Sequence, residues 1–149
     1  MAQVARIDEI ISFWSSRQPR VDGVPLRDSV DPFSLRPWLG HCAIYEAIED
    51  GADFNVRLEG SVISDLGGEN WTGRRASEID FRYNSTLRAD LRRVATTRQY
   101  DVAKIVIVQA EFIEIERALL PFTFGSGRID QIVGCIYRLP TARGHAQQE

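Results

Sequence analysis

The spacing of apolar residues changes three times along this chain, and these changes restrict the folds that it can adopt. Apolar residues recur at helical spacing in residues 6–17, at strand spacing in residues 41–58, at helical spacing in residues 62–99, and at strand spacing in residues 102–139. The order predicts an α+β fold, with a five-stranded antiparallel sheet, helices on one of its faces and an extra N-terminal helix.

The first helix is expected over residues 6–17, because Ile7, Ile10, Ile11 and Trp14 fall on one helical face. Such a face can cap the chain's own core or pair with a second copy of the chain. We expect homodimerisation through these four residues.

The connector after this helix contains Pro19, Gly23 and Pro25, which predicts irregular structure over residues 18–26. Asp31-Pro32 then predicts the start of a short helix, because aspartate accepts a free backbone N–H and proline needs to donate none. We therefore divide the chain into an N-terminal helix and connector, a main domain and a disordered polar tail, at residues 1–30, 31–139 and 140–149.

A β-hairpin is expected next, from a strand over residues 41–48 and a second strand that carries Phe54, Val56 and Leu58 at alternate positions. A short helix follows and ends at Gly67-Gly68, since glycine adopts the backbone angles of a helix C-cap. Gly60 and Gly73 are expected to allow chain reversals.

The second half contains the longest helix after the first, over residues 83–99, and three strands at residues 102–108, 111–124 and 131–139. The turn Gly125-Ser126-Gly127 separates the last two strands.

Charge and hydropathy exclude two classes of partner. The formal net charge is -3, and Lys104 is the only lysine, so the composition does not favour nucleic-acid binding. No stretch approaches the ~20 apolar residues that span a bilayer. Asp8 and Glu9 interrupt the layout of a secretory signal, so we expect a cytoplasmic protein with no membrane span.

The reactive residues are too few to predict an enzyme. His41 and His145 are the only imidazoles, no nucleophile has an evident base, and we predict neither a metal site nor a cofactor. Cys42 and Cys135 are expected to be buried reduced thiols. Redox sensing by the pair is the alternative, and it requires the two sulfur atoms to be adjacent.

Several short motifs occur in an order that is more specific than any one of them. They are Trp14, Pro25 with Arg27, Asp31-Pro32, Phe54-Asn55-Val56-Arg57-Leu58-Glu59-Gly60, Trp71-Thr72-Gly73, and Leu119-Leu120-Pro121-Phe122 followed by Asp130. With the order of helices and strands, they resemble the PAS domain family, in its bacterial stand-alone subgroup, over residues 14–139.

The resemblance implies a sensory or regulatory domain without catalysis, which binds a small molecule, a signalling protein partner, or both. Such domains often hold a ligand between the sheet and the short helices. The candidate ligand-binding residues are Arg57, Leu58, Val62, Leu66, Trp71, Leu91, Phe122 and Ile136.

Each of these candidates also has a structural interpretation. The apolar ones form plain core if no cavity exists, and Arg57 either clamps an acidic ligand or forms an ion pair with an acidic residue near the N-terminal segment. A ligand-free dimerisation or docking adaptor is the alternative function, and a small-substrate enzyme is a third.

Overall fold

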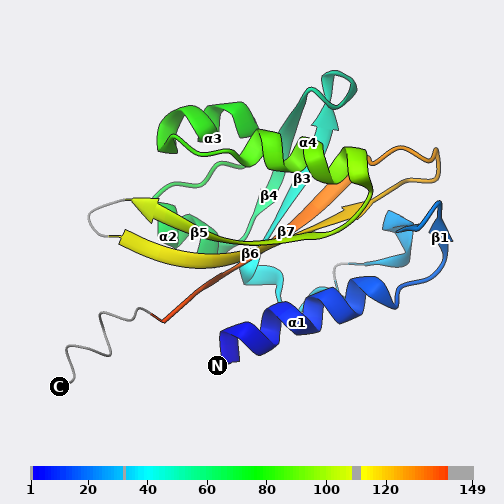
Figure 1. The fold of residues 1–149 in the computed structure, drawn as a ribbon, viewed down its shortest axis with the longest axis horizontal. Helices are drawn as coiled ribbons and strands as arrows, with labels where there is room; N and C mark the ends of the chain where they lie inside the picture. Colours follow the sequence, from blue (N-terminus) through cyan, green and yellow to red (C-terminus); the bar gives the residue numbers. More distant parts are fainter. Residues whose placement is uncertain (1, 32, 109–111, 141–149) are drawn as a thin grey trace.

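The computed structural model describes residues 2–31, 33–108 and 112–140, and its centre is one antiparallel sheet (Figure 1). The strand order is β4-β3-β7-β6-β5. The strands are β3 (Cys42–Ile48), β4 (Asp53–Glu59), β5 (Asp101–Val108), β6 (Phe112–Phe122) and β7 (Gln131–Arg138). The expected α+β fold with a five-stranded antiparallel sheet is therefore confirmed.

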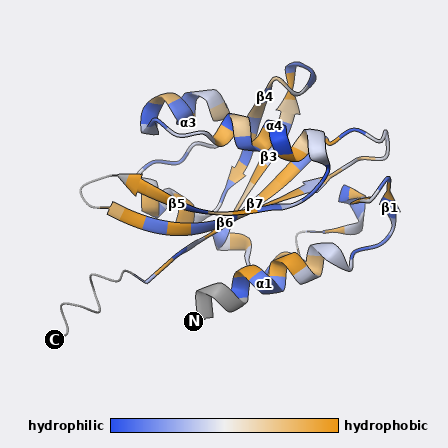
Figure 2. Ribbon diagram, viewed as in Figure 1, coloured by the Kyte–Doolittle hydropathy of each residue, from blue (hydrophilic) through white to orange (hydrophobic). Residues whose placement is uncertain are grey.

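Helices cover both faces of the sheet. Helix α1 (Ala2–Ser15) lies on one face, and the helices α2 (Ser61–Gly67), α3 (Ala76–Tyr83) and α4 (Leu87–Thr97) lie on the other (Figure 1). Because successive strand residues point to opposite faces, the inner strands β3, β6 and β7 contribute to two hydrophobic layers. Figure 2 shows the hydrophobic residues concentrated in the central strands, between the two layers of helices.

Helix α1 packs against its own sheet. Ile7, Ile10 and Trp14 are buried in one cluster with residues of β6 and β7, and Ile11 packs half-buried beside them. The Trp14 indole Nε1 donates a hydrogen bond of 2.8 Å to the backbone oxygen of Pro121. The residues expected at a dimer interface thus lie in the chain's own core in this arrangement, because periodicity identifies an apolar face but not what covers it.

The connector is more regular than expected. Residues 20–25 form a small hairpin of β1 (Arg20–Val21) and β2 (Val24–Pro25), which turns at Asp22 and Gly23, both with positive φ. The backbone N–H of Arg27 then donates to Thr123, which joins the connector to the end of β6.

The short helix expected after residue 31 is a run of turns. The backbone N–H of Ser34 donates to the Asp31 carboxylate at 2.8 Å, so this aspartate caps a turn instead of a helix. The turns end in a 3₁₀ segment, Leu39–His41. Pro32 and residues 141–149 of the expected tail lie outside the described residues.

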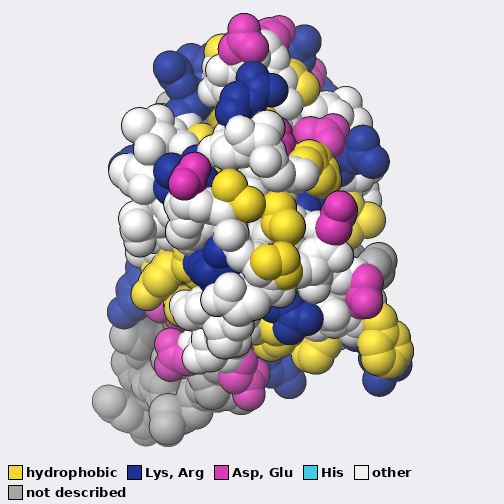
Figure 3. Space-filling model, turned by 90° about the vertical axis from the view of Figure 1, so that its right-hand side faces the viewer, with side chains coloured by type: hydrophobic (Ala, Val, Ile, Leu, Met, Phe, Trp, Pro, Cys, Tyr) yellow, Lys and Arg dark blue, Asp and Glu magenta, His cyan; other side chains and the backbone are white. Residues whose placement is uncertain are grey.

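Arginine side chains pair with acidic residues over much of the surface. Arg75 contacts Glu49 at 2.7 Å, and Arg82 contacts Glu69 at 3.3 Å. Figure 3 shows basic and acidic side chains interspersed on one end of the molecule, with hydrophobic atoms between them. The arginines on this end do not gather into one basic patch.

Candidate functional site

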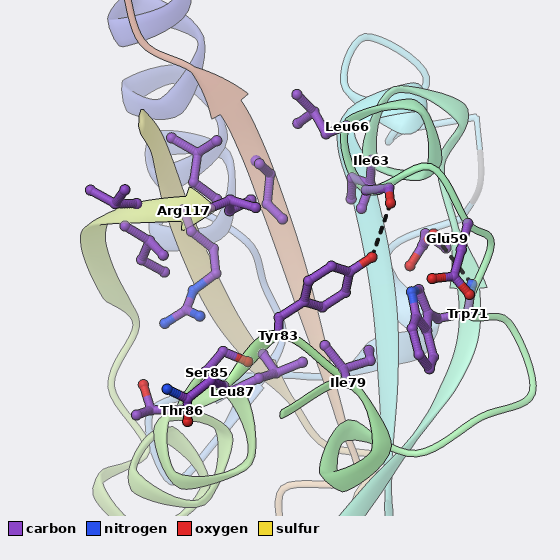
Figure 4. A pocket seen from close by; sticks show the side chains of 18 of the residues that line it. Glu59, Ile63, Leu66, Trp71, Ile79, Tyr83, Ser85, Thr86, Leu87 and Arg117 are labelled. Carbon is purple, nitrogen blue, oxygen red and sulfur yellow. Dashed lines mark hydrogen bonds between the residues drawn. The ribbon is translucent and has the colours of Figure 1, made fainter. Parts of the chain in front are cut away.

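A cavity of about 320 Å³ lies between the sheet and helices α2, α3 and α4. Its volume is at the lower end of the range of small-molecule pockets. Most of its lining is apolar. The sheet side includes Tyr45, Ile105, Ile107, Ile115 and Ile136, and the helical side includes Ile63, Leu66, Ile79, Tyr83 and Leu87 (Figure 4).

Two buried or half-buried carboxylates position the helices that cover the cavity. Asp80 accepts hydrogen bonds from the backbone N–H of Leu87 at 2.7 Å and of Arg88 at 2.9 Å, so it caps the start of α4. Asp53, at the start of β4, accepts the hydroxyl of Ser77 at 2.6 Å near the start of α3. Carboxylates at helix N-termini satisfy free backbone N–H groups and favour the helix dipole.

Tyr83 joins α3 to α2 across the cavity. Its hydroxyl donates a hydrogen bond of 3.0 Å to the backbone oxygen of Gly67, and its ring meets Trp71 edge-on with 6.0 Å between centroids (Figure 4). Tyr45 lies on the sheet side, where burial raises the pKa of its phenol to about 12. Both tyrosines line this mainly apolar space.

A β-bulge in β4 decides which side chain enters the cavity. The register pairs Val56 with Tyr45 and Leu58 with Ile44, so Arg57 is the extra residue on β4. One extra residue reverses the alternation of faces beyond it. As a result Glu59 lines the cavity, and Leu58 is 40% exposed outside it.

Glu59 is half-buried, and this burial raises the pKa of its carboxyl group above the usual value. Two hydrogen bonds to its Oε2 act in the opposite direction without cancelling the effect: the hydroxyl of Ser64 donates at 2.8 Å and the backbone N–H of Trp71 at 3.3 Å. The site therefore favours the neutral carboxyl group more than water does.

Replacing Glu59 by glutamine should change the pH dependence of stability. A raised carboxyl pKa stabilises the fold fully below the unfolded-state pKa, and this contribution is lost as pH rises through the folded-state pKa. We expect Glu59→Gln to melt close to the wild type near pH 4 and above it near pH 7, in thermal unfolding followed by circular dichroism. A difference that stays constant with pH would contradict this assignment.

Arg117 is a charged cavity residue that was not predicted from the sequence, as are Glu59 and Glu69. Arg117 lies on β6, is only 5% exposed, and lines the cavity. Its Nη2 donates to Asp90 of α4 at 2.8 Å, while its Nε has no hydrogen-bond acceptor among the described residues. The sequence pattern could have indicated this residue. Arg117 occupies an inward-facing position of its strand, and the neighbouring residues on that face of the strand are apolar.

The Arg117–Asp90 pair continues to the surface. Arg93 contacts Asp90 at 3.1 Å and Asp101, at the start of β5, at 3.0 Å. Burial by itself raises the pKa of Asp90, but the hydrogen bonds and charge of Arg117, with the Arg93 hydrogen bond, outweigh it and lower that pKa. This ion-pair chain links the cavity to α4 and to the edge strand.

Comparison with known families identifies the fold. A model of the PAS domain matches residues 2–137. The chain belongs to the PAS domain family. The resemblance derived from the sequence motifs is thereby confirmed.

Solved structures of PAS domains support the same fold at low sequence identity. A light-oxygen-voltage domain, studied with a flavin analogue, is 11% identical with a TM-score of 0.57, over 78% of this chain and 89% of that one. The PAS domain of Bordetella pertussis BvgS is 14% identical with a TM-score of 0.56, over 78% and 90%. A fungal light-oxygen-voltage photoreceptor is 18% identical with a TM-score of 0.51, over 89% and 91%. Among curated proteins no relative matches.

Three of the eight residues expected to bind a ligand line the cavity of this PAS domain. They are Leu66, Trp71 and Ile136. Val62 does not line it, because the face of α2 that carries Val62 lies over Gly40 and the next residue, Ile63, points to the cavity.

The other candidates lie outside the cavity. Leu91 is a residue of α4 that is buried in the core, and Phe122 faces α1 on the opposite side of the sheet. Arg57 forms an ion pair of 3.2 Å with Glu46 of the neighbouring strand β3. The ion-pair interpretation of Arg57 therefore describes this structure. The same glutamate accepts a hydrogen bond from Gln131, which in turn accepts one from Arg27 of the N-terminal segment.

The two cysteines of the PAS domain lie away from the cavity. Cys42 and Cys135 are directly opposite each other on β3 and β7, and both are buried on the α1 side. A hydrogen bond with Cys42, together with burial, raises the pKa of the Cys135 thiol. The adjacency that redox pairing requires is present, while the environment favours the unreactive thiol form.

Within the described ranges, no three His, Cys, Asp or Glu side chains group closely enough to hold a metal ion. Over the same residues, none of the helices has the length and apolarity needed to cross a membrane.

Proposed function

We propose that this PAS domain binds a small molecule in the cavity between the sheet and α2–α4, and passes the signal to a protein partner without catalysing a reaction. PAS domains are typically sensory or signalling modules. The observation that carries the proposal is the cavity itself, a largely apolar space of about 320 Å³ bordered by a few polar side chains.

The ion-pair chain supplies a route for the signal. A ligand that contacts Arg117 acts on Asp90 of α4, and through Arg93 on Asp101 of the edge strand β5. A ligand shifts an equilibrium only by its difference in affinity between two arrangements. A ligand that alters the pairing of Arg117 would provide such a difference. The partner would then bind the surface formed by α4 and β5.

Native mass spectrometry of the purified protein, compared with its denatured mass, tests the proposal directly. We expect a mass excess that is lost on denaturation, and an absorption spectrum of the same sample characterises the bound molecule. A bare mass, with no small molecule found to bind in titrations, would favour the ligand-free docking adaptor.

Filling the cavity should abolish binding. We expect Leu66→Trp to remove the mass excess, because the larger side chain occupies the space lined by Leu66. Leu58→Trp is the matched control: it adds the same side chain at a 40% exposed position outside the cavity and should keep the ligand. Far-UV circular dichroism checks the fold of both variants. Equal loss in both would argue against the cavity as the binding site.

A further inference from the structure

Two buried N–H donors border the cavity without an acceptor among the described residues. They are the indole Nε1 of Trp71 and the guanidinium Nε of Arg117. Each residue is 5% exposed, and each lines the cavity. Buried donors in native proteins are nearly always satisfied, since leaving one unpaired is unfavourable. The pair therefore points to an acceptor that enters the cavity.

The two donors approach from opposite sides. Figure 4 shows Trp71 on the β4 side and Arg117 on the β6 side, with Tyr83 between them. Strands β4 and β6 are three positions apart in the sheet, which separates their backbones by roughly 14 Å at the usual strand spacing. The sheet side between them carries Tyr45 and Ile136. An elongated, flat body fits this arrangement.

The charges around the cavity disfavour an anion. Glu59, Glu69 and Arg117 are its charged lining residues. The charge of Arg117 is already balanced by Asp90, which contacts its Nη2 at 2.8 Å. An anionic ligand would therefore enter beside two carboxyl groups without a free positive charge to meet it. An uncharged acceptor, unlike an anion, requires no free positive charge and can bind through the unpaired N–H donors alone.

We infer that the ligand of this cavity is an uncharged, flat and mainly apolar ring compound that carries an acceptor oxygen, not an organic anion. This inference rests on the proposed function, because it assumes that the cavity binds a small molecule. The volume provides room for about ten water-sized groups, taking roughly 30 Å³ for each, so a two-ring compound is of suitable size.

Three probes of matched shape test the inference on the full chain: 2-acetylnaphthalene, which carries an uncharged acceptor, 2-naphthoate, which is an anion, and 2-ethylnaphthalene, which has no acceptor. We expect 2-acetylnaphthalene to bind about tenfold more tightly than 2-ethylnaphthalene, the effect of one hydrogen bond to a buried donor, and more tightly than 2-naphthoate. Titrations followed by NMR also report the Nε–H of Arg117, whose signal should move downfield with 2-acetylnaphthalene and stay in place with 2-ethylnaphthalene.

The variant Arg117→Lys keeps a positive charge beside Asp90 but removes the Nε donor. We expect it to lose most of the preference for 2-acetylnaphthalene while its affinity for 2-ethylnaphthalene stays within about twofold, a change that falls below one hydrogen bond. Arg93→Lys is the control, because it alters an exposed arginine of the same ion-pair chain that does not line the cavity. Thermal unfolding confirms that both variants fold.

The outcomes separate the inference from the proposed function. Equal binding of 2-acetylnaphthalene and 2-ethylnaphthalene, or tightest binding of 2-naphthoate, would overturn the inference and leave a ligand-binding cavity in place. Failure of all three probes together with a bare native mass would overturn both. If the protein purifies with a bound molecule, an uncharged acceptor supports the inference and an organic anion overturns it.

Discussion

Replacing Trp14 by alanine is expected to lower the free energy of unfolding by about 3–5 kcal/mol, the usual cost of removing a large buried aromatic side chain. Trp14 is 5% exposed, and its indole nitrogen bonds the backbone oxygen of Pro121 at 2.8 Å. The Arg20 guanidinium also stacks over its ring at 4.5 Å. Urea unfolding followed by far-UV circular dichroism measures the change without depending on tryptophan fluorescence.

Phe33→Ala is the control for this variant, because Phe33 is 72% exposed and its loss should change stability by no more than about 0.5 kcal/mol. Analytical ultracentrifugation of both variants tests the alternative role of α1. If Trp14→Ala keeps wild-type stability but becomes monomeric, while the wild type is dimeric, the helix serves the dimer that its sequence pattern first indicated. Lower stability with an unchanged oligomeric state supports the packing described here.

Replacing Gly60 by alanine is expected to lower the free energy of unfolding by about 3 kcal/mol, at the upper end of the usual cost of overpacking. A Cβ atom at Gly60 would lie 2.6 Å from the backbone carbon of Gly40 and 2.7 Å from the backbone oxygen of Leu39. Backbone atoms yield less readily than the end of a flexible side chain, so β4 or the 3₁₀ segment must move.

Gly40→Ala provides the matched control on the opposite side of the same contact. Its added Cβ would meet side-chain atoms of Ser61 and Val62 at 3.7 Å, which is ordinary van der Waals contact. We expect it to unfold within about 1 kcal/mol of the wild type in the same urea titration, because no overpacking results. Similar losses in both variants would show that the close approach at Gly60 is not the cause.

Gly60 also shows the limit of reasoning from residue type. At Gly60 and Gly73, the residue type predicts chain reversals with unusual backbone angles. Gly73 has φ of 89°, as expected, but Gly60 has φ of -67°, which any residue adopts. The reason for glycine at position 60 is the approach of a segment some twenty residues earlier in the chain, and no local pattern reports such an approach.

The residues of the candidate site were predictable where side chains alternate between the two faces of a strand without interruption. On β7, strict alternation places Ile136 at the cavity, as expected. On β4, the prediction that Leu58 lines the cavity was wrong. The extra residue Arg57 reverses the face to which each following side chain points, so Glu59 lines the cavity in place of Leu58. Phe122 follows the alternation of β6 but faces α1, since the pattern alone does not state which face holds the cavity.

The sequence by itself determined the order of the main helices and the five sheet strands, the antiparallel sheet and the family, because periodicity and turn residues act over a few neighbouring positions. The tertiary structure alone decided which element covers each apolar face, where the bulge lies, and how Arg117 pairs with Asp90 on the side of the cavity opposite Trp71. These features depend on contacts between residues distant in the chain. Their free energies arise from packing and burial that exist only once the sheet and both helical layers are assembled.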